Sequence, residues 1–357
     1  MKPVIPFLAM VLLGASEIAY AADPAGFRTL SARAPERGSD LTVLVWYPAG
    51  EGGKPAVIGD NPLFRGTRVK ADAAPAEGRH PLVLLSHGSG GHAANLGWIA
   101  SRLVAEGFVV AAPNHPGSTT GDASQASTIK IWNRPADISA VLTAVVADPA
   151  VGAGIDPDRV GVLGFSLGGY TALALAGARV DAAGYARYCE SGAAGPECAW
   201  FARGGVNLRS LDAERFNRQN RDPRVRMAVS VDPAFARAYD RASLSGISVP
   251  THIINLGRPG WIIPAVEGSA LAEAIPGAEY ETVPDAIHFS FLGECKPEGA
   301  AVLKAEGDED PLCDDGGSRP RAALHAELAS MIAAAFKRHL QERPGAEASG
   351  PAPESAR

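Results

Sequence analysis

The chain has 357 residues, of which 46% are hydrophobic, 20% charged and 6% aromatic. This composition is typical of a globular protein and excludes a disordered, collagen-like or coiled-coil polymer. With 33 Lys and Arg against 39 Asp and Glu, and no basic run, the sequence lacks the electrostatic footprint of a nucleic-acid-binding protein. The 40 Gly and 28 Pro residues favour many loops between short buried strands over a bundle of long helices, and so an α/β fold.

The N-terminal residues have the order of a secretory signal peptide. A charged Lys2 is followed by an apolar stretch, residues 4–15, and by an Ala-x-Ala pattern that ends at Ala21. We expect residues 1–21 to be cleaved and the mature protein to be exported, periplasmic or secreted. The alternative is a membrane anchor, but the stretch is shorter than the ~20 residues of a span and contains Pro6. No later apolar stretch approaches that length, so no transmembrane segment is expected after cleavage.

The four cysteines can pair without remainder, and disulfides persist in the oxidising compartments that an exported protein reaches. Cys189 and Cys198 lie in one Gly/Pro-containing segment, and Cys295 and Cys313 lie in another. Local pairing within each segment is therefore the favoured connectivity, and free thiols are the alternative. None of the four has the C-x-x-C spacing of a redox or zinc site.

The predicted elements begin with a hairpin and continue as alternating strands and helices. Residues 27–31 and 41–47 are β-branched and aromatic, with an Arg-Gly-Ser turn between them, which predicts an antiparallel hairpin at a sheet edge. Short apolar runs typical of parallel strands buried on both faces follow at residues 81–86, 108–112, 159–165, 225–231, 249–256 and 279–283. Helix-like stretches alternate with them at residues 94–106, 135–146, 169–176, 268–274 and 321–340. This order predicts one doubly wound α/β domain over residues 22–340, with a mostly parallel sheet and helices on both faces.

Three segments do not fit that alternation. Residues 178–222 are a long polar insertion that carries the first cysteine pair. We expect it to form part of the wall of a pocket at Ser166, or a cap over that residue. Trp200 and Phe201, its bulkiest apolar residues, either face the substrate or only pack the cap onto the body. Residues 293–320 are expected to be a Gly/Asp/Glu-rich loop, and residues 341–357 a disordered tail.

A Gly-x-Ser-x-Gly sequence with Ser166 at its centre lies between a buried strand and a helix-like stretch. A nucleophile elbow needs this context, because its sharp turn lifts the serine above the sheet. Gly164 and Gly168 remove the Cβ atoms that would collide there. The motif alone also occurs in plain Gly-rich loops. With the strand before and the helix after, the sequence predicts that Ser166 is a nucleophile.

The Gly-rich turn at residues 87–91, after the strand 82–86, is where an acyl-transfer enzyme takes its second oxyanion donor. We expect the backbone N–H groups of Ser89 and Leu167 to form the oxyanion hole. The competing interpretation is a dinucleotide fingerprint of the form G-x-G-x-x-A in the same turn. That interpretation requires an acidic residue at the end of the next strand, and the next strand ends Ala-Ala-Pro-Asn.

A Ser-His-acid triad in this fold has the chain order Ser, acid, His. Of the histidines after Ser166, His288 follows the last predicted strand in a loop, so it is the predicted base. The others lie in a strand-like run or on the terminal helix; they are His252, His325 and His339.

The acid is predicted by elimination. The commonest position follows the strand that ends near Leu256, but the loop there contains no carboxylate before Glu267. The preceding strand ends in Asp232, which is therefore the predicted orienting acid. The alternative for Asp232 is an Asx turn before Pro233, and Asp285 is too near His288 in sequence to be an easy partner.

No metal or other cofactor is expected. His87, His92 and His115 do not have the spacing of a known zinc motif, and a Gly-rich turn holds ligands poorly. We expect His87 and His115 to line the mouth of the pocket.

The chain resembles the α/β-hydrolase superfamily and, more narrowly, the bacterial "predicted dienelactone hydrolase" proteins, relatives of platelet-activating-factor acetylhydrolase. The matching motifs are GFRTL at 26–30, RG at 37–38, VWYP at 45–48, LSHGSG at 85–90, NHPGS at 114–118, RPADIS at 134–139, GFSLGG at 164–169, VDP at 231–233 and HF at 288–289. The resemblance implies a serine esterase acting on small acyl esters, with Asp232 as the acid and Ser89 and Leu167 as oxyanion donors. Dienelactone hydrolases use a cysteine nucleophile, whereas this chain has Ser166.

Three functions remain open at this stage. The first is an exported carboxylic-ester hydrolase of acetylhydrolase or lipase type, acting on a small-molecule or lipid-like ester. The second is an amidase or peptidase with the same triad, since Ser-His-Asp chemistry does not distinguish esters from amides. The third is a non-catalytic secreted binding module, because a fold does not imply a function.

Overall fold

The computed structural model describes residues 24–307, 310–317 and 319–341. The predicted signal peptide, residues 1–21, lies outside these residues, and so does the predicted tail, residues 341–357, beyond its first residue. Within the described part of the chain, no helix is long and apolar enough to cross a membrane.

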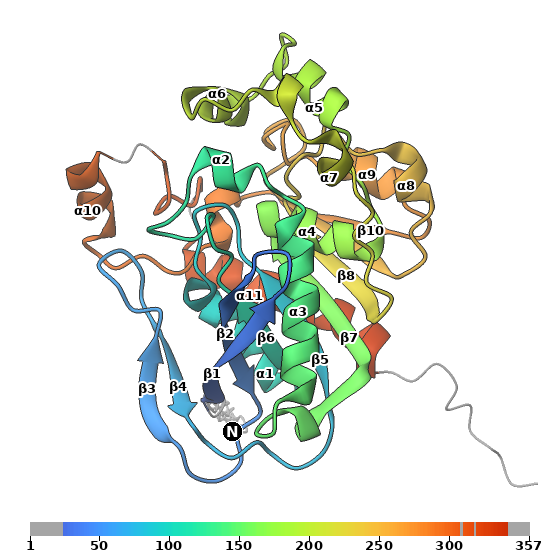
Figure 1. Ribbon diagram of the computed structural model, residues 1–357. Helices are drawn as coiled ribbons and strands as arrows, with labels where there is room; N and C mark the ends of the chain where they lie inside the picture. Colours follow the sequence, from blue (N-terminus) through green and yellow to red (C-terminus); the bar gives the residue numbers. More distant parts are fainter. Residues whose placement is uncertain (1–23, 308–309, 318, 342–357) are drawn as a thin grey trace, which may run out of the picture.

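One sheet of ten strands forms the centre of the described part (Figure 1), with the strand order β10-β9-β8-β7-β5-β6-β2-β1-β4-β3. The strands are β1 (Ala25–Ala34), β2 (Ser39–Tyr47), β3 (Lys54–Ile58), β4 (Thr67–Ala71), β5 (His80–Ser86), β6 (Val109–Pro113), β7 (Ile155–Phe165), β8 (Val225–Val231), β9 (Thr251–Leu256) and β10 (Glu279–Val283). The six strands from β5 to β10 are parallel to their neighbours among themselves, whereas β2 runs antiparallel to both β6 and β1. The expected mostly parallel sheet is confirmed.

Helices cover both faces of the sheet, because successive side chains of its central strands are apolar in both directions. Leu82 and Leu84 of β5 belong to a buried cluster with α3, whereas Val83 and Leu85 belong to a second cluster with α1 and α11. Figure 1 shows α3 in front of the sheet and α1 and α11 behind it. The helices of the body are α1 (Gly97–Ala105), α2 (Gln125–Thr128), α3 (Asn133–Ala147), α4 (Leu167–Ala176), α8 (Arg241–Ser245), α9 (Ser269–Ala274) and α11 (Arg321–Phe336), with the short turns η1 (Ala93–Leu96), η2 (Gly152–Gly154), η4 (His288–Phe291) and the π-helical η5 (Lys337–Gln341).

The position of the first hairpin differs from the expectation. β1 and β2 pair antiparallel as predicted, but they do not form the sheet edge, because β4 pairs with β1 and β3 pairs with β4. These two strands have only five residues each, and β3 has no buried residue and contains Pro55. An exposed edge strand needs no apolar pattern and tolerates proline, so no local pattern indicates this pair of strands.

The insertion at residues 178–222 folds into a helical cap. It contains α5 (Ala182–Cys189), α6 (Pro196–Arg203), η3 (Leu208–Ser210) and α7 (Ala213–Phe216). Figure 1 shows these helices at the top of the molecule, beyond the carboxyl ends of the parallel strands. Tyr185, Phe201 and Phe216 pack with Phe235 and Tyr170 of the body in a third apolar cluster. The Cys189–Cys198 disulfide joins the end of α5 to α6.

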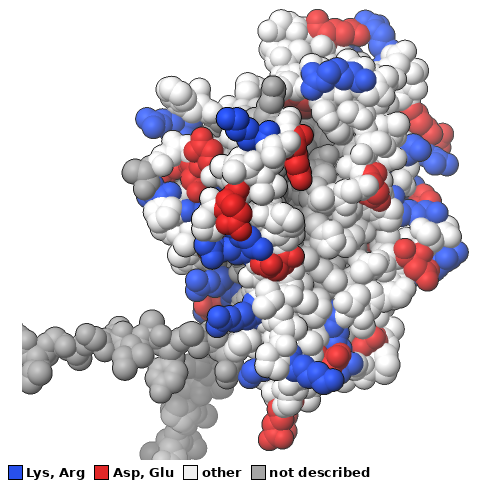
Figure 2. All heavy atoms as spheres, turned by 90° about the vertical axis from the view of Figure 1, so that its left-hand side faces the viewer, with Lys and Arg blue, Asp and Glu red and all other residues white. Residues whose placement is uncertain are grey.

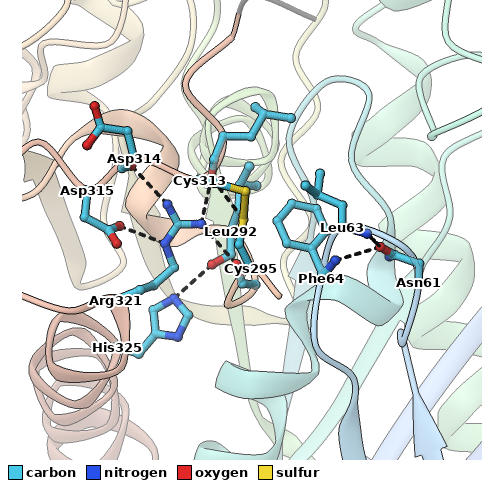
Figure 3. The surroundings of a disulfide bond; sticks show 12 residues. Asn61, Leu63, Phe64, Leu292, Cys295, Cys313, Asp314, Asp315, Arg321 and His325 are labelled. Atoms are coloured by element: carbon cyan, nitrogen blue, oxygen red, sulfur yellow. Dashed lines mark hydrogen bonds and ion pairs between the residues drawn. A yellow bond between two sulfur atoms is a disulfide. The ribbon is translucent and has the colours of Figure 1, made fainter. Parts of the chain in front are cut away.

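The segment at residues 293–320 is not the plain loop that its composition predicted, because it contains α10 (Gly299–Glu306). Its disulfide joins Cys295 to Cys313 (Figure 3). Beside this disulfide, Arg321 donates to the carbonyl of Leu312 at 2.8 Å and to the carboxylate of Asp315 at 2.7 Å. Cys295 also forms an isolated antiparallel bridge with Phe64, in the loop between β3 and β4. The segment is therefore hydrogen-bonded both to Arg321 at the start of α11 and to the loop between β3 and β4.

Candidate active site

The turn around Ser166 is a strained junction between β7 and α4. Ser166 has φ 56° and ψ −116°, a backbone conformation that a residue with a side chain rarely adopts. A Cβ atom on Gly164 would lie 1.8 Å from the carbonyl oxygen of Gly168, and one on Gly168 would lie 1.9 Å from that of Ser86. Only glycine fits at both positions, so the Gly-x-Ser-x-Gly pattern is required by the close passage of the strand and the helix.

Ser166, His288 and Asp232 form a chain of hydrogen bonds. Ser166 Oγ lies 3.2 Å from His288 Nε2, and His288 Nδ1 lies 2.8 Å from Asp232 Oδ2. The three residues come from the turn after β7, from η4 after β10 and from the turn after β8. The imidazole is 14% exposed and the carboxylate is fully buried. The structure thus brings together the three residues that the sequence analysis singled out as nucleophile, base and acid.

Asp232 is also hydrogen-bonded to a residue that the sequence analysis did not single out. Its Oδ1 accepts hydrogen bonds from Asn255 Nδ2 at 2.7 Å and from Leu256 N at 2.9 Å. The Asn255 amide also donates to Val266 O at 2.8 Å, which fixes its orientation. The signal that could have found Asn255 is its position: it is a single amide side chain within the apolar run that forms β9, where a buried polar group needs a partner.

The candidate oxyanion donors lie on two segments that meet at Ser166. Leu167 is the first residue of α4, where N–H groups lack a partner within the helix and the helix dipole favours negative charge. In the turn after β5, the N–H groups of Gly90 and Gly91 donate to backbone carbonyls, whereas the N–H of Ser89 donates to no backbone carbonyl of the described residues. Ser89 and Leu167 both line the cavity that contains Ser166.

A buried cation, Arg134, supports the turn after β5 from behind. Its Nη1 and Nη2 donate to the carbonyl oxygen of His87 at 3.0 and 2.6 Å, and the residue is 2% exposed. Burial lowers the pKa of Arg134 to about 9, so the group remains a cation at neutral pH. The sequence analysis assigned no function to Arg134, although an arginine on the apolar face of a helix indicates a buried polar contact.

The expectation that His87 and His115 line the pocket mouth is wrong. Both are buried, at 1% and 0% exposure, and neither lines the cavity at Ser166. His115 Nδ1 donates to Asp137 Oδ2 at 2.8 Å, and its Nε2 accepts from Ser86 Oγ at 3.0 Å. Burial, together with the charges of nearby arginines, lowers the pKa of His115 well below its usual value. A neutral imidazole with both nitrogens satisfied can be buried at low cost, which explains its position.

Asp137 connects this network to the first hairpin. Arg37, in the turn between β1 and β2, donates from Nε and Nη2 to the two carboxylate oxygens of Asp137, both at 2.7 Å. Its Nη1 donates to the Pro116 carbonyl at 2.8 Å. Burial raises the pKa of Asp137, and the hydrogen bonds from Arg37 oppose that shift. The turn carrying Ser89 thus rests on a buried set of charges that extends to the β1–β2 turn.

A cavity of about 520 Å³ opens between Ser166 and the cap. Ser166, His288 and Ser89 line its floor, and the cap contributes an aromatic wall that includes Tyr185, Trp200 and Phe201. Trp200 and Phe201 therefore border the cavity and also belong to the cluster that packs the cap onto the body. The two alternatives considered for these residues are not exclusive in this structure.

The other carboxylates considered as the acid lie elsewhere. Glu267 Oε1 accepts a hydrogen bond from Ser269 N at 2.8 Å, at the start of α9. Asp285 forms an ion pair with Arg319, in which Nη1 lies 2.9 Å from Oδ1. Asp232 is the carboxylate that contacts His288.

The histidines weighed as metal ligands have other partners. His92 Nδ1 accepts from Ala94 N at 3.1 Å at the start of η1, and His87 and His115 lie in the buried network behind the turn. Across residues 24–307, 310–317 and 319–341, no group of three or more His, Cys, Asp or Glu side chains is placed to hold a metal ion.

Solved structures that are similar to this chain include several hydrolases. A ferulic acid esterase from Streptomyces cinnamoneus is 22% identical and aligns over 94% of this chain and 96% of its own with a TM-score of 0.62. A puromycin-hydrolyzing peptidase from Mycobacterium tuberculosis is 15% identical over 89% of this chain and 40% of its own, with a TM-score of 0.50. A dienelactone hydrolase from Anabaena variabilis ATCC 29413 is 14% identical over 89% of this chain and 100% of its own, with a TM-score of 0.48. At such identities the likeness to the first two shows the fold alone.

The sequence itself assigns the family. No curated protein matches the chain. The profile of the alpha/beta hydrolase family matches residues 82–349, a range that begins in β5, contains Ser166, Asp232 and His288, and extends past α11. Together with the parallel sheet and the strained serine turn, this match shows that the chain belongs to the alpha/beta hydrolase family.

Proposed function

We propose that the protein is an exported serine hydrolase that cleaves carboxylic esters through an acyl-enzyme intermediate. The observation that carries the proposal is the hydrogen-bonded chain from Ser166 Oγ through His288 to the buried Asp232, at a strained turn that presents the serine to a cavity. Ser166 is the proposed nucleophile, His288 the general base and acid, and Asp232 the residue that orients the imidazole.

The proposed reaction has two steps. His288 Nε2 accepts the Ser166 proton while Oγ attacks the ester carbonyl carbon, and the Asp232 carboxylate stabilises the imidazolium. The N–H groups of Ser89 and Leu167 are the proposed donors to the oxyanion of the tetrahedral intermediate. His288 then protonates the leaving alcohol, and an acyl group remains on Ser166. In the second step His288 accepts a proton from a water that attacks the carbonyl carbon of the acyl-enzyme. The bond to Ser166 Oγ then breaks, His288 returns the proton to Oγ, and the carboxylic acid is released.

The aromatic part of the cavity supports an uncharged acyl group. Tyr185, Trp200 and Phe201 of the cap line the cavity, and charged side chains line it as well, among them Glu197, Arg203 and Arg237. On the face seen in Figure 2, Lys and Arg are interspersed with Asp and Glu, so that face offers no field of one sign to select a charged substrate. We therefore assign selection of the acyl group to the shape of the cavity and to the aromatic side chains in its lining. This agrees with the small acyl esters implied by the resemblance to the acetylhydrolase-related proteins.

Export is supported by the cysteines. Cys189 pairs with Cys198 and Cys295 with Cys313, and disulfides of this kind persist in oxidising compartments. The proposed location is therefore the periplasm or the outside of the cell, after removal of residues 1–21.

A fluorophosphonate probe tests the proposed chemistry. The wild-type protein is expected to be labelled at one serine and to hydrolyse 4-nitrophenyl acetate, and Ser166→Ala is expected to lose both. A matched 4-nitroanilide measures the preference for esters over amides. An unlabelled, folded wild-type protein would exclude a serine hydrolase, and faster cleavage of the anilide would replace the esterase with an amidase.

A further inference from the structure

One loop beside His288 exposes apolar surface that packing does not explain. Among the described residues, only three large hydrophobic side chains are exposed: Trp261 at 79%, Val57 at 56% and Ile263 at 37%. Val57 lies on the edge strand β3, far along the chain. Trp261 and Ile263 belong to the same loop, between β9 and α9. An exposed tryptophan near a proposed catalytic histidine indicates a ligand-binding surface.

The loop is held in this conformation by its neighbours. Ile262, between the two exposed residues, is 7% exposed. Trp261 N donates to the Arg258 carbonyl at 2.9 Å, and Arg237 Nε donates to the Pro264 carbonyl at 3.0 Å. Alternate residues therefore point inward and outward, and the burial of Ile262 forces Trp261 and Ile263 to face out.

Trp261 and Ile263 line a second cavity, of about 480 Å³, which His288 also lines. This second cavity and the cavity under the cap share three residues: Ile263, His288 and Phe289. Ser89 and Leu167 line only the cavity under the cap. The two spaces thus adjoin at the imidazole.

The reaction geometry gives each space a different part of the ester. In the tetrahedral intermediate, the oxyanion points to the Ser89 and Leu167 N–H groups and the leaving oxygen points to His288 Nε2. The alcohol portion must therefore extend past the imidazole. We infer that the cavity lined by Trp261 and Ile263 binds the alcohol portion, and that the cavity under the cap binds the acyl portion. This inference rests on the proposed function.

The chemistry of the second cavity indicates the class of alcohol. The Arg258 guanidinium carbon lies 5.6 Å from the centre of the Trp261 ring, and Arg258 lines the same cavity. Two carboxylates also line this cavity, and each has a partner: Asp232 is bonded to His288 Nδ1, and Asp285 is paired with Arg319. An aromatic ring can pack against the exposed indole while an anionic substituent faces Arg258. The expected substrates are esters of an aromatic alcohol that carries a carboxylate.

Three acetate esters with different alcohols test this assignment: methyl acetate, phenyl acetate and 4-acetoxybenzoate. Trp261→Ala is expected to lower kcat/KM for phenyl acetate about tenfold relative to methyl acetate, through the lost aromatic contact. Arg258→Met is expected to lower kcat/KM for 4-acetoxybenzoate about fivefold relative to phenyl acetate, through the lost charge pair. Differences in leaving-group basicity cancel when each ratio is compared with that of the wild type. Val57→Ala, which removes exposed apolar surface elsewhere, is the control and should leave both ratios unchanged.

Deacylation separates the two cavities. All three esters give the same acetyl-enzyme, from which the alcohol has left, so the rate of its hydrolysis should be unchanged in Trp261→Ala and Arg258→Met. Equal losses of kcat/KM for all three alcohols, or a changed deacylation rate, would overturn the assignment. The exposed loop could also contact a membrane. If the variants lost only their binding to phosphatidylglycerol vesicles, the loop would be such a contact and the assignment would again be overturned. Each variant is first titrated with the fluorophosphonate. A wild-type protein that is not labelled refutes the proposed function, whereas a labelled protein with unchanged ratios refutes only the alcohol site.

Discussion

The two walls of the cavity at Ser166 are held together in different ways. The wall on the body rests on buried charges: Arg134 supports the turn that carries Ser89, and Asp137 is fully buried between Arg37 and His115. The wall on the cap rests on an aromatic cluster and on the Cys189–Cys198 disulfide. Buried charges have few alternative arrangements, whereas aromatic packing adapts to small changes. The body wall is therefore suited to fixing reacting groups, and the cap wall to selecting a shape.

Two bidentate ion pairs express this contrast directly. Arg37 and Asp137 make two bonds of 2.7 Å, and their side chains are 12% and 0% exposed. Arg209 and Glu190, in the cap, make bonds of 2.5 and 2.6 Å with the same geometry, but their side chains are 74% and 45% exposed. Both pairs have two hydrogen bonds, but only the pair of Arg37 and Asp137 is buried. Comparing them therefore shows how burial changes the contribution of an ion pair to stability when the number of hydrogen bonds is the same.

The largest effect is expected at the candidate triad. Ser166→Ala and His288→Ala should each lower kcat by about 10⁴-fold or more, and Asp232→Asn by a comparable or smaller factor, because triad residues act as a unit. Steady-state kinetics on 4-nitrophenyl acetate measures the loss. Glu267→Gln is the matched control, since that carboxylate is bonded at the start of α9. Near-normal kcat in Asp232→Asn together with a large loss in Glu267→Gln would reassign the acid.

The next effect compares the two ion pairs. Asp137→Asn should lower the free energy of unfolding by about 3–5 kcal/mol, because it removes the ion-pair partner of the largely buried Arg37 and a negative charge that stabilises the buried Arg134 cation. Glu190→Gln should produce no measurable loss, because water solvates the partner that remains. Urea unfolding of both variants measures the difference. Equal losses would show that burial does not distinguish the walls.

The sequence predicted the body of the fold better than its periphery. The parallel strands are continuous apolar runs because both faces are buried, and that pattern is visible without a structure. The edge strand β3 is exposed, and α10 is a short helix in a charged segment, so neither required an apolar pattern. Their pairing depends on tertiary contacts such as the bridge between Phe64 and Cys295, which no local pattern encodes.

The same division applies to the site. Ser166, His288 and Asp232 were predicted because chain order and strand ends restrict where such residues can stand. Asn255, Arg134 and Asp137 were not predicted, because their roles are contacts with residues that lie far from them in the sequence. His87 and His115 were placed at the pocket mouth because a Gly-rich loop is normally exposed, whereas Arg134 and Asp137 supply the partners that allow burial.

A smaller effect is expected on the free energy of unfolding at acid pH, through His325. His325 Nε2 donates to the Ser290 and Leu292 carbonyls at 3.1 and 2.9 Å, on the turn that contains His288, and its ring stacks on Trp98 at 3.7 Å. Burial, and then the charge of Arg321, lowers the pKa of His325 to about 4. The unfolded chain, with a histidine pKa of about 6.5, therefore binds a proton that the folded protein does not between these values. The stabilisation is complete above pH 6.5 and is lost as the pH falls towards 4.

At pH 5 this group should cost about 2 kcal/mol of stability relative to neutral pH. Replacing it by Gln, which donates a hydrogen bond but does not titrate, should make the loss between pH 7.5 and pH 5 smaller by about that amount. Urea unfolding at the two pH values measures it. His339→Gln is the control, because that side chain is exposed at the end of the same helical segment. An unchanged pH dependence in His325→Gln would remove this group from the acid response.

The smallest effect is expected in the cap, where it bears on selectivity. Trp200 borders the cavity, and each acyl CH₂ buried against it contributes about 0.8 kcal/mol. Trp200→Ala should lower kcat/KM for 4-nitrophenyl octanoate about fivefold relative to the acetate, a loss of somewhat more than one such contact. Cys198→Ser should shift the same ratio less, because the disulfide holds α6 against α5 without contacting the acyl chain. Trp200→Phe, which keeps an aromatic ring, is the matched control.

Since the acyl group stays on Ser166 after the alcohol leaves, Trp200→Ala should also change the deacylation rate of the octanoyl-enzyme, which Trp261→Ala should not. Unchanged chain-length selectivity in Trp200→Ala and Cys198→Ser, with only thermal stability lowered, would make the cap a structural cover and leave selection to the body wall.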